Sequence, residues 1–231
     1  MSTPPDPGNR NVAIDGPVAS GKTVTARALA RELRFLYLDT GAMYRAAAYL
    51  TLSEGIDLDN EDAIVNLLAR HTIRLVADES VESGYRVEID GHDTAMRLFD
   101  PDVAAVVSSV AALGRVRERM VAAQREIARE GSVVMAGRDI GTVVLPEARF
   151  KFFLTASVDE RAKRRHAEFA ERGVLLPFEE VREQIAERDR IDMTRAVAPL
   201  RAAADAILID STSISSDAVV ARMRAAVEAA G

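Results

Sequence analysis

Residues 16–23, Gly-Pro-Val-Ala-Ser-Gly-Lys-Thr, combine residue types and a spacing that suit the binding of a triphosphate. In the pattern of a glycine, four residues and then Gly-Lys-Thr, the glycines let the backbone curl until successive N–H groups face one point. Lys22 supplies a mobile cation for the β- and γ-phosphates, and the hydroxyl of Thr23 can bind Mg²⁺. The predicted triphosphate-binding residues are Gly16, Pro17, Val18, Ala19, Ser20, Gly21, Lys22, Thr23 and Val24.

The elements on either side of this segment, here called the phosphate-binding loop (residues 16–23), are those that the motif needs. Residues 11–15 include a short apolar run that is typical of a buried strand, and residues 24–33 have a helical pattern. The N-terminus of a helix adds positive potential at an anion site. The alternative is an ordinary glycine turn that enters a helix, but the spacing and both flanks favour the phosphate site.

A second pair of elements places polar residues at another strand end. Residues 35–38 read as a short strand that ends at Asp39, and a helix follows to about residue 52. Thr40 suits the N-cap of this helix, and Arg45 lies one turn into it. Because ligands of open α/β sheets bind at the carboxyl ends of the strands, we expect Arg45 to reach a second phosphate. The alternative is a capping threonine and a surface arginine.

A third strand end carries an Arg-Asp pair. The strand predicted over residues 132–136 is followed by a glycine-bracketed loop over residues 137–144, which contains Arg138 and Asp139. By the same sheet-edge argument this pair is a candidate for ligand binding. A structural salt bridge inside a tight loop is the alternative.

The stretch from 71 to 95 interrupts the alternation of strands and helices. Residues 71–77 and 85–89 alternate apolar and polar positions, with a turn between them, as in an antiparallel hairpin with one exposed face. We therefore expect an inserted subdomain over about residues 70–110 that holds a substrate. The other expected elements are helices over 61–70, from Pro101 to a break at Leu113-Gly114, and over 115–130, 178–193 and 216–230, and strands over 150–154 and 206–210.

Four cations within five positions lie on a predicted helix near residue 160: Arg161, Lys163, Arg164 and Arg165. A solvated basic face is the ordinary explanation for such a run. Beside a phosphate-binding loop in an acidic protein, the pattern favours an arginine lid over about residues 157–176 that closes on the triphosphate and stabilises the transferring phosphoryl group.

Length and composition restrict the possible classes of protein. The 231 residues suit one α/β domain over residues 11–231, and the proline-rich segment over residues 1–10 is predicted to be a disordered tail. The net charge of −6 argues against a general nucleic-acid-binding surface. The chain has no cysteine and no apolar run long enough to cross a membrane. We therefore expect a cytoplasmic protein without nucleic-acid or membrane partners.

Over about residues 11–230 the chain resembles the bacterial cytidylate kinases, a family of nucleoside monophosphate kinases. The resemblance is carried by four segments: Ile14-Asp15-Gly16-Pro17 through Lys22; Tyr37-Leu38-Asp39-Thr40-Gly41-Ala42-Met43-Tyr44-Arg45; Gly137-Arg138-Asp139-Ile140-Gly141-Thr142-Val143-Val144; and Arg188-Asp189 through Arg195-Ala196-Val197-Ala198-Pro199-Leu200. The sequence departs from the family pattern at Ala136, Val24 and Met193. The resemblance implies an α/β P-loop fold of three layers. Its parts would be a central parallel five-stranded sheet, a small inserted antiparallel subdomain for the nucleoside monophosphate and a short helical lid.

The resemblance also implies roles for individual residues. The acceptor phosphate would be held by Arg45, Arg138 and Arg195, the cytosine base by Ser108, Arg117 and Asp139, and the ribose by Arg188 and Asp192, with Thr40 at the nucleotide pocket. The expected catalytic set is Lys22, Arg138, Arg161, Arg164 and Arg165. Mg²⁺ would be held by Thr23, and by Asp39 through water.

The base assignment agrees with the chemistry of cytosine. Cytosine presents an N4 amino donor and acceptors at N3 and O2, which a carboxylate and a guanidinium or hydroxyl complement. The predicted reaction is therefore transfer of the γ-phosphate of ATP to CMP or dCMP by a monomeric kinase. The alternatives are a P-loop kinase for another nucleoside monophosphate or small metabolite, and a regulatory GTPase. The GTPase would need an Asn-Lys-x-Asp guanine-binding motif, and none of the three lysines follows an asparagine.

Overall fold

The computed structural model describes residues 10–78, 80–81, 85–94, 97–129, 131–171 and 173–229. The strands are β1 (Val12–Asp15), β2 (Leu36–Asp39), β3 (Ile73–Ala77), β4 (Tyr85–Ile89), β5 (His92–Asp93), β6 (Val133–Gly137), β7 (Phe150–Thr155) and β8 (Ile207–Asp210). The α-helices are α1 (Lys22–Leu33), α2 (Thr40–Ser53), α3 (Glu61–Arg70), α4 (Pro101–Ala112), α5 (Gly114–Ala128), α6 (Val158–Glu171), α7 (Phe178–Thr194) and α8 (Ser216–Glu228). A 3₁₀ turn, η1 (Arg97–Phe99), and a π-helical turn, η2 (Ile140–Val144), complete the described elements.

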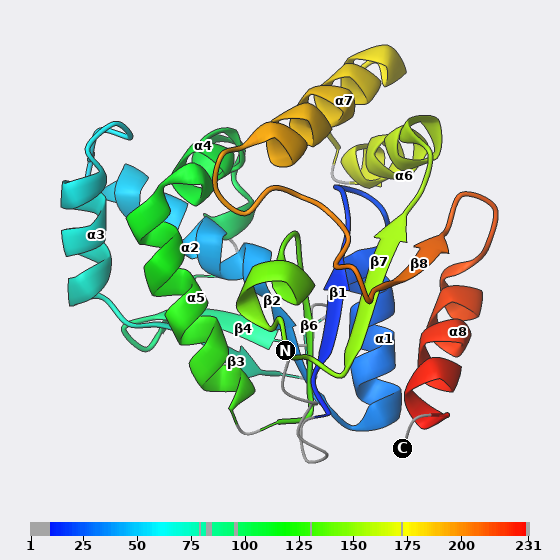
Figure 1. The fold of residues 1–231 in the computed structure, drawn as a ribbon. Helices are drawn as coiled ribbons and strands as arrows, with labels where there is room; N and C mark the ends of the chain where they lie inside the picture. Colours follow the sequence, from blue (N-terminus) through cyan, green and yellow to red (C-terminus); the bar gives the residue numbers. More distant parts are fainter. Residues whose placement is uncertain are drawn as a thin grey trace. The chain divides into compact units, whose positions relative to one another are not determined.

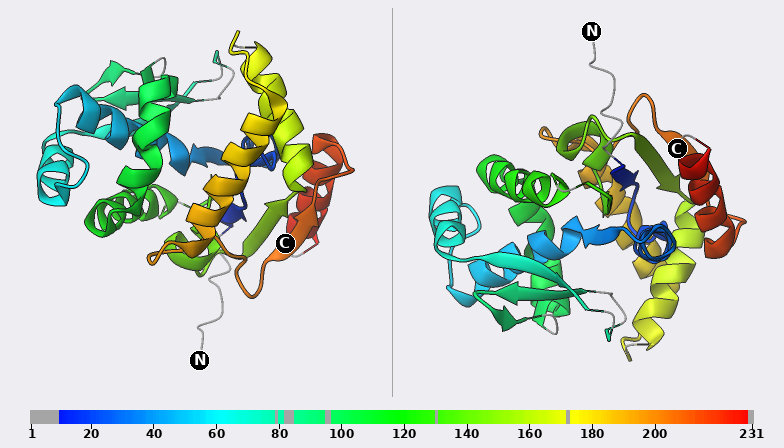
Figure 2. Two further views of the ribbon diagram at one scale, coloured as in Figure 1. Left: turned by 90° about the horizontal axis from the view of Figure 1, so that it is seen from above. Right: turned by 90° about the horizontal axis from the view of Figure 1, so that it is seen from below.

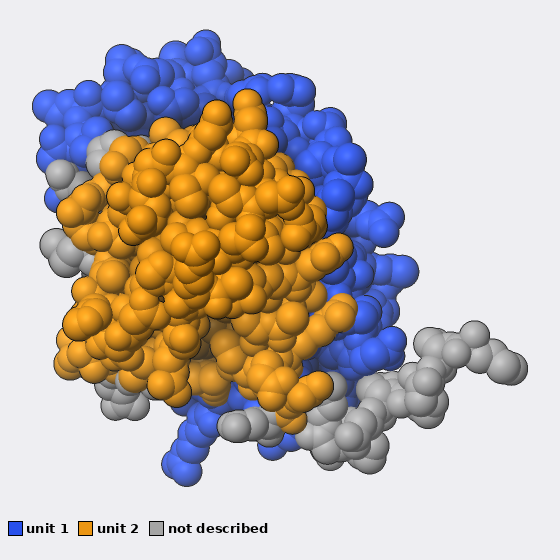
Figure 3. All heavy atoms as spheres, turned by 90° about the vertical axis from the view of Figure 1, so that its left-hand side faces the viewer, with its two compact units in different colours: residues 1–35, 131–231 blue, residues 36–130 orange. Residues whose placement is uncertain are grey.

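Two compact units divide the chain, and Figure 3 colours them separately. One unit, called unit 1, consists of the chain up to residue 35 and from residue 131 onward, and unit 2 consists of residues 36–130. Residues 1–9 of the predicted tail lie outside the described residues. Among the helices that the structure describes, none is long and apolar enough to cross a membrane.

The main sheet is parallel, with the strand order β2-β6-β1-β7-β8 (Figure 1), which confirms the predicted five-stranded sheet. In unit 1, β1 lies between β6 and β7, and Ile14 lies opposite Ala136 on one side and Phe152 on the other. Val12, Ala13 and Ile14 have no exposed surface, as expected for a central strand that is covered on both faces. The apolar run before the phosphate-binding loop is therefore the centre of the core of unit 1.

Helices flank this sheet in unit 1. α1 packs beside α8, and the two helices contact β1, β6 and β7. α6 and α7 lie side by side near the end of the sheet at which β7 ends (Figures 1 and 2). Val18 and Ala19 of the phosphate-binding loop pack against the small core between α6 and α7, which contains Ala162, Val181 and Ile185. Apolar side chains of α6 and α7 thus cover one side of the loop.

Unit 2 contains the second sheet, which is antiparallel with the order β3-β4-β5. Tyr85, Val87 and Ile89 of β4 are buried and alternate with half-buried residues, which confirms the predicted hairpin with one exposed face. The expected insertion over residues 70–110 lies within unit 2 and stays a prediction. Residues 79, 82–84, 95 and 96 of that stretch lie outside the described residues.

Two local predictions are wrong. The N-cap of α2 is Asp39 instead of Thr40, because the Asp39 carboxylate accepts the N–H of Gly41 at 2.9 Å and Thr40 is already helical. The segment over 137–144, predicted as a glycine-bracketed loop, contains the π-helical turn η2. Its N–H groups at Ile140 and Gly141 are satisfied by a carboxylate from β1, a tertiary contact that local sequence does not reveal.

Gly16 meets a steric limit that yields a stability prediction. Its φ is +151°, and a Cβ at this position would lie 1.9 Å from the carbonyl oxygen of Leu154 in β7. We predict that Gly16→Ala lowers the free energy of unfolding by more than about 2 kcal/mol, measured by urea denaturation. The control is Gly173→Ala, which shares a positive φ of +74° but has no described atom within 4 Å, and which should cost about 1 kcal/mol. Equal losses for the two variants would contradict the steric account.

Candidate active site

The phosphate-binding loop joins the end of β1 to the start of α1. Ala19 and Gly21 have left-handed backbone angles, with φ of 56° and 91°. Left-handed residues beside right-handed ones turn successive N–H groups to a common side and form an anion-binding concavity. Gly21 is the N-cap of α1 and offers no side chain to cap it, so the positive end of the helix dipole faces the same concavity.

Lys22 is held close to the loop. It is 8% exposed, and its Nζ donates to the carbonyl oxygen of Pro17 at 2.5 Å and to Oγ of Ser20 at 3.2 Å. Thr23 follows on the exposed side of the first helical turn, where its hydroxyl suits a Mg²⁺ ion that is also held by phosphate oxygens. The described residues include no cluster of three or more acidic or histidine side chains that could hold a metal by itself.

Asp15 links the strand before the loop to the Gly-Arg-Asp segment, and sequence reasoning missed it. Its two carboxylate oxygens accept the N–H groups of Ile140 and Gly141, each at 2.7 Å, so it caps η2. Burial raises the pKa of Asp15 to about 6, against the opposing effect of these two hydrogen bonds, and the nearby charge of Asp139 raises it further. An acidic residue that ends a fully apolar strand beside the motif is the signal that could have found it.

Four of the predicted acceptor residues meet within unit 1 as two ion pairs. Arg138 Nε lies 2.9 Å from Oδ2 of Asp192, and Arg195 lies 3.7 Å from Asp139. Arg138 and Asp139 thus pair with residues at the end of α7 or just after it, instead of with each other. Arg188 lies one turn before Asp192 on α7, so both residues project from the same face of that helix.

The three arginines of α6, the helix of the predicted lid, have different partners, and the closing of the lid stays a prediction. Arg161 is 3% exposed and makes a bidentate pair with Asp189 at 3.0 and 2.5 Å. Arg164 donates to the backbone carbonyl of Ser211 at 2.7 Å. Arg165 pairs with Glu168, one turn along the helix, and lies over the ring of Phe169.

In unit 2, Asp39 is the centre of a hydrogen-bonded cluster. Its Oδ1 accepts the N–H of Gly41, and its Oδ2 accepts from Arg45 at 3.1 Å and from the hydroxyl of Tyr85 at 3.0 Å. Burial and the charge of Asp39 raise the pKa of Tyr85, so the phenol stays a neutral donor. Three of roughly four acceptor positions of this carboxylate are used, so Asp39 orients Arg45, and its predicted contact to Mg²⁺ through water stays a prediction.

Arg45 is also restrained from its other side, since its guanidinium lies 4.8 Å from the ring centroid of Phe99. Tyr85 and Phe99 were not predicted as site residues, because neither aromatic residue belongs to a recognisable sequence motif. Thr40 is buried in the first turn of α2.

The residues expected to bind the base in unit 2 lie on two consecutive helices. Ser108 is half-buried on α4, and Arg117 is 3% exposed on α5. Arg117 donates to the carbonyl oxygen of Ala111 at 3.1 Å and lies over the ring of Tyr44 at 5.5 Å. Arg117 is therefore fixed in place by contacts within unit 2.

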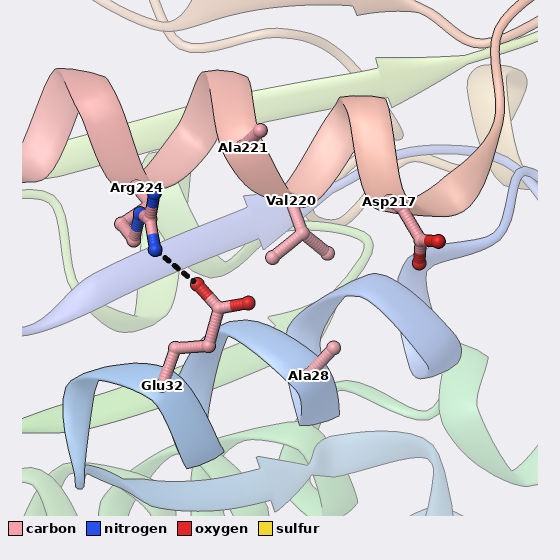
Figure 4. Close-up of a pocket in the computed structure, with 6 residues that line it drawn as sticks. All are labelled: Ala28, Glu32, Asp217, Val220, Ala221 and Arg224. Atoms are coloured by element: carbon pink, nitrogen blue, oxygen red, sulfur yellow. Dashed lines mark hydrogen bonds and ion pairs between the residues drawn. The ribbon is translucent and has the colours of Figure 1, made fainter.

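A small cavity between α1 and α8 is separate from these residues. It has a volume of about 140 Å³ and is lined by Ala28, Glu32, Asp217, Val220, Ala221 and Arg224. Figure 4 shows Arg224 of α8 directed toward Glu32 of α1, at 3.4 Å. Sites for small molecules usually exceed about 300 Å³, so this cavity is too small for a nucleotide.

Comparison with known proteins gives one consistent result. The family model described as "Cytidylate kinase" matches residues 12–229. The chain is 46% identical to a cytidylate kinase of Enterococcus faecalis, with 97% of this chain and 98% of the relative covered. It is 50% identical to a cytidylate kinase of Geobacillus sp., with 93% and 95% covered.

Among solved structures, an uncharacterised protein from Eubacterium ventriosum shares the fold alone. Its TM-score to this chain is 0.51 at 12% identity, with 95% of this chain and 98% of that chain covered.

The buried carboxyl of Asp15 gives a pH-dependent prediction. Its pKa rises from the ordinary 3.8 to about 6, so folding favours the protonated form. The resulting stabilisation is fully present below the ordinary pKa and is lost as the pH rises through about 6. Between about pH 4 and pH 7, the free energy of unfolding of wild type should fall by about 2.5 kcal/mol relative to that of Asp15→Asn.

The measurement is urea denaturation of both proteins across this pH range, and only the difference between them is interpreted. Asp15→Asn carries a constant loss, because its amide nitrogen opposes one backbone N–H. A difference that does not change with pH would contradict the assigned pKa.

Proposed function

The chain belongs to the cytidylate kinase family, and from this premise we propose that it transfers the γ-phosphate of ATP to CMP and dCMP, forming ADP and CDP or dCDP. The single observation that carries the proposal is the match of the family model over residues 12–229, which spans both the phosphate-binding loop and the Gly-Arg-Asp segment. The proposal includes a role in pyrimidine nucleotide metabolism. It also includes the prediction that the protein is a monomer in the cytoplasm.

The donor half of the reaction is assigned to the phosphate-binding loop. Its N–H groups and the dipole of α1 would hold the β- and γ-phosphates. Lys22 would exchange its bond to the Pro17 carbonyl for one to a phosphate oxygen, because a charged acceptor makes the stronger hydrogen bond. Bound Mg²⁺, held by Thr23 and the phosphates, would neutralise charge on the transferring group.

The acceptor half is assigned to the paired arginines and aspartates of unit 1. Arg138 and Arg195 would hold the acceptor phosphate. Asp139 would accept a hydrogen bond from the N4 amino group of cytosine. Arg188 and Asp192 would bind the ribose. Arg138 and Arg195 each face an aspartate, so the anionic acceptor phosphate would compete with these carboxylates for the two guanidinium groups. Arg45, Ser108 and Arg117 of unit 2 are proposed as the remaining acceptor contacts.

The proposed chemistry needs no strong general base. The attacking group is a phosphate oxygen that is already anionic, so catalysis consists of in-line positioning and neutralisation of charge. Asp139 and Asp39 are therefore not assigned as bases. Asp39 instead orients Arg45 through the hydrogen bond that it accepts.

The proposal predicts a ranking of acceptors. In an assay of ADP release with saturating ATP, CMP and dCMP should exceed UMP by at least about tenfold in kcat/KM, because uracil places its O4 acceptor against the carboxylate of Asp139. Asp139→Asn should reduce the CMP-to-UMP ratio, because a carboxamide can donate to O4. The comparison is internal to each protein, so it is insensitive to differences in active concentration.

Lys22→Ala is the matched control, since it should lower the rate with every acceptor by a similar factor. A wild-type preference for AMP, UMP or shikimate would contradict the proposed function. An unchanged CMP-to-UMP ratio in Asp139→Asn would contradict the base assignment alone.

A further inference from the structure

Two of the three α6 arginines contact the phosphate-binding loop through its backbone carbonyls. Arg161 Nη1 donates to the carbonyl oxygen of Val18 at 3.2 Å, and Arg164 Nη1 lies 3.5 Å from that of Ser20. In an anion-binding loop the N–H groups converge on the anion, and the carbonyl groups point away from it. A side chain that donates to these carbonyls therefore stands behind the loop, on the side opposite the phosphates.

Ser211 extends this support to the last strand of the sheet. It is 3% exposed and lies directly after β8. Its Oγ lies 3.2 Å from the Ser20 carbonyl and 3.0 Å from that of Thr155, and it accepts from Arg164 at 3.1 Å. The backbone N–H of Ser211 donates to Thr155 at 2.8 Å, so the ends of β7 and β8 are joined at this point.

The charges of the two arginines are already balanced within unit 1. Arg161 and Asp189 form a buried pair with side chains 4% and 11% exposed, and Arg161 Nε also donates to the Ala156 carbonyl at 2.9 Å. Arg164 pairs with Glu160, one turn earlier on α6, at 3.1 Å. Moving Arg161 away from Asp189 would leave a buried carboxylate unpaired, and moving Arg164 would remove a donor from the buried Ser211. Both costs oppose movement of these arginines toward a phosphate.

We propose that Arg161, Arg164 and Ser211 are positioning residues that brace the phosphate-binding loop from its carbonyl side. By fixing the peptide planes of Val18 and Ser20, they hold the N–H groups of the loop in the orientation that receives the phosphates. The brace serves the proposed use of ATP. Its contacts join parts of unit 1 to one another and involve no nucleotide atom, so the stability of the free protein tests it independently of the acceptor.

The experiment combines the melting temperature of the nucleotide-free protein with calorimetric affinities for ADP and a non-hydrolysable ATP analogue. The variants are Ser211→Ala, Arg164→Met and the double variant. Each single change should lower the melting temperature by about 3 °C and weaken both nucleotides alike by about tenfold. Because Arg164 and Ser211 support the same carbonyl group, their effects should not add. The double variant should lose little more melting temperature and affinity than the single variant with the larger loss.

Two controls separate the brace from general effects. Ser213→Ala removes an exposed hydroxyl two residues further along the chain and should change neither quantity. Arg165→Ala removes a surface arginine whose ion pair contributes little, so the melting temperature of the free protein should stay the same.

Three results would overturn the proposal. If Arg164 instead binds a phosphate of ATP, Arg164→Met would leave the melting temperature unchanged. It would weaken the binding of the ATP analogue far more than that of ADP. A purely structural contact would lower the melting temperature without changing either affinity. Independent roles would make the losses of Arg164→Met and Ser211→Ala additive. If instead the proposed function is wrong, wild type will not prefer CMP or dCMP in the acceptor assay. It will still bind ADP and the ATP analogue.

Discussion

The close approach between Gly16 and β7 is the constraint on which the rest of the site depends. A Cβ at Gly16 would lie 1.9 Å from the Leu154 carbonyl oxygen, so only glycine lets the chain turn out of β1 beside this residue of β7. That turn sets where α1 begins and hence where Lys22 and the helix dipole point. It also places Val18 and Ser20 within reach of α6.

Three arginines of unit 1 are paired with aspartates. Arg161 with Asp189, Arg138 with Asp192 and Arg195 with Asp139 each place a guanidinium against a carboxylate. A buried charge without a partner is costly, so each pair compensates the burial of its two members. In the proposed function the first pair supports the loop, whereas the other two pairs would exchange partners with a nucleotide.

The sequence predicted the elements well and the partners poorly. Short apolar runs and helical periodicity located the parallel strands, and the hairpin followed from its alternation, because these patterns reflect burial of local segments. Arg161 and Asp189 are 28 residues apart, and Asp15 and Ile140 are 125 apart, so their contacts depend on tertiary packing. The different partners of Arg161, Arg164 and Arg165 could not be predicted for the same reason: a run of cations does not show which of them a carboxylate or carbonyl holds.

The destination of the phosphoryl group is the central claim, and ³¹P NMR of the products tests it most directly. With ATP and CMP as the only nucleotides, the account predicts that a CDP β-phosphate resonance grows at the rate at which the ATP γ-phosphate resonance disappears. Growth of inorganic phosphate in its place, with CMP unchanged, would contradict the account.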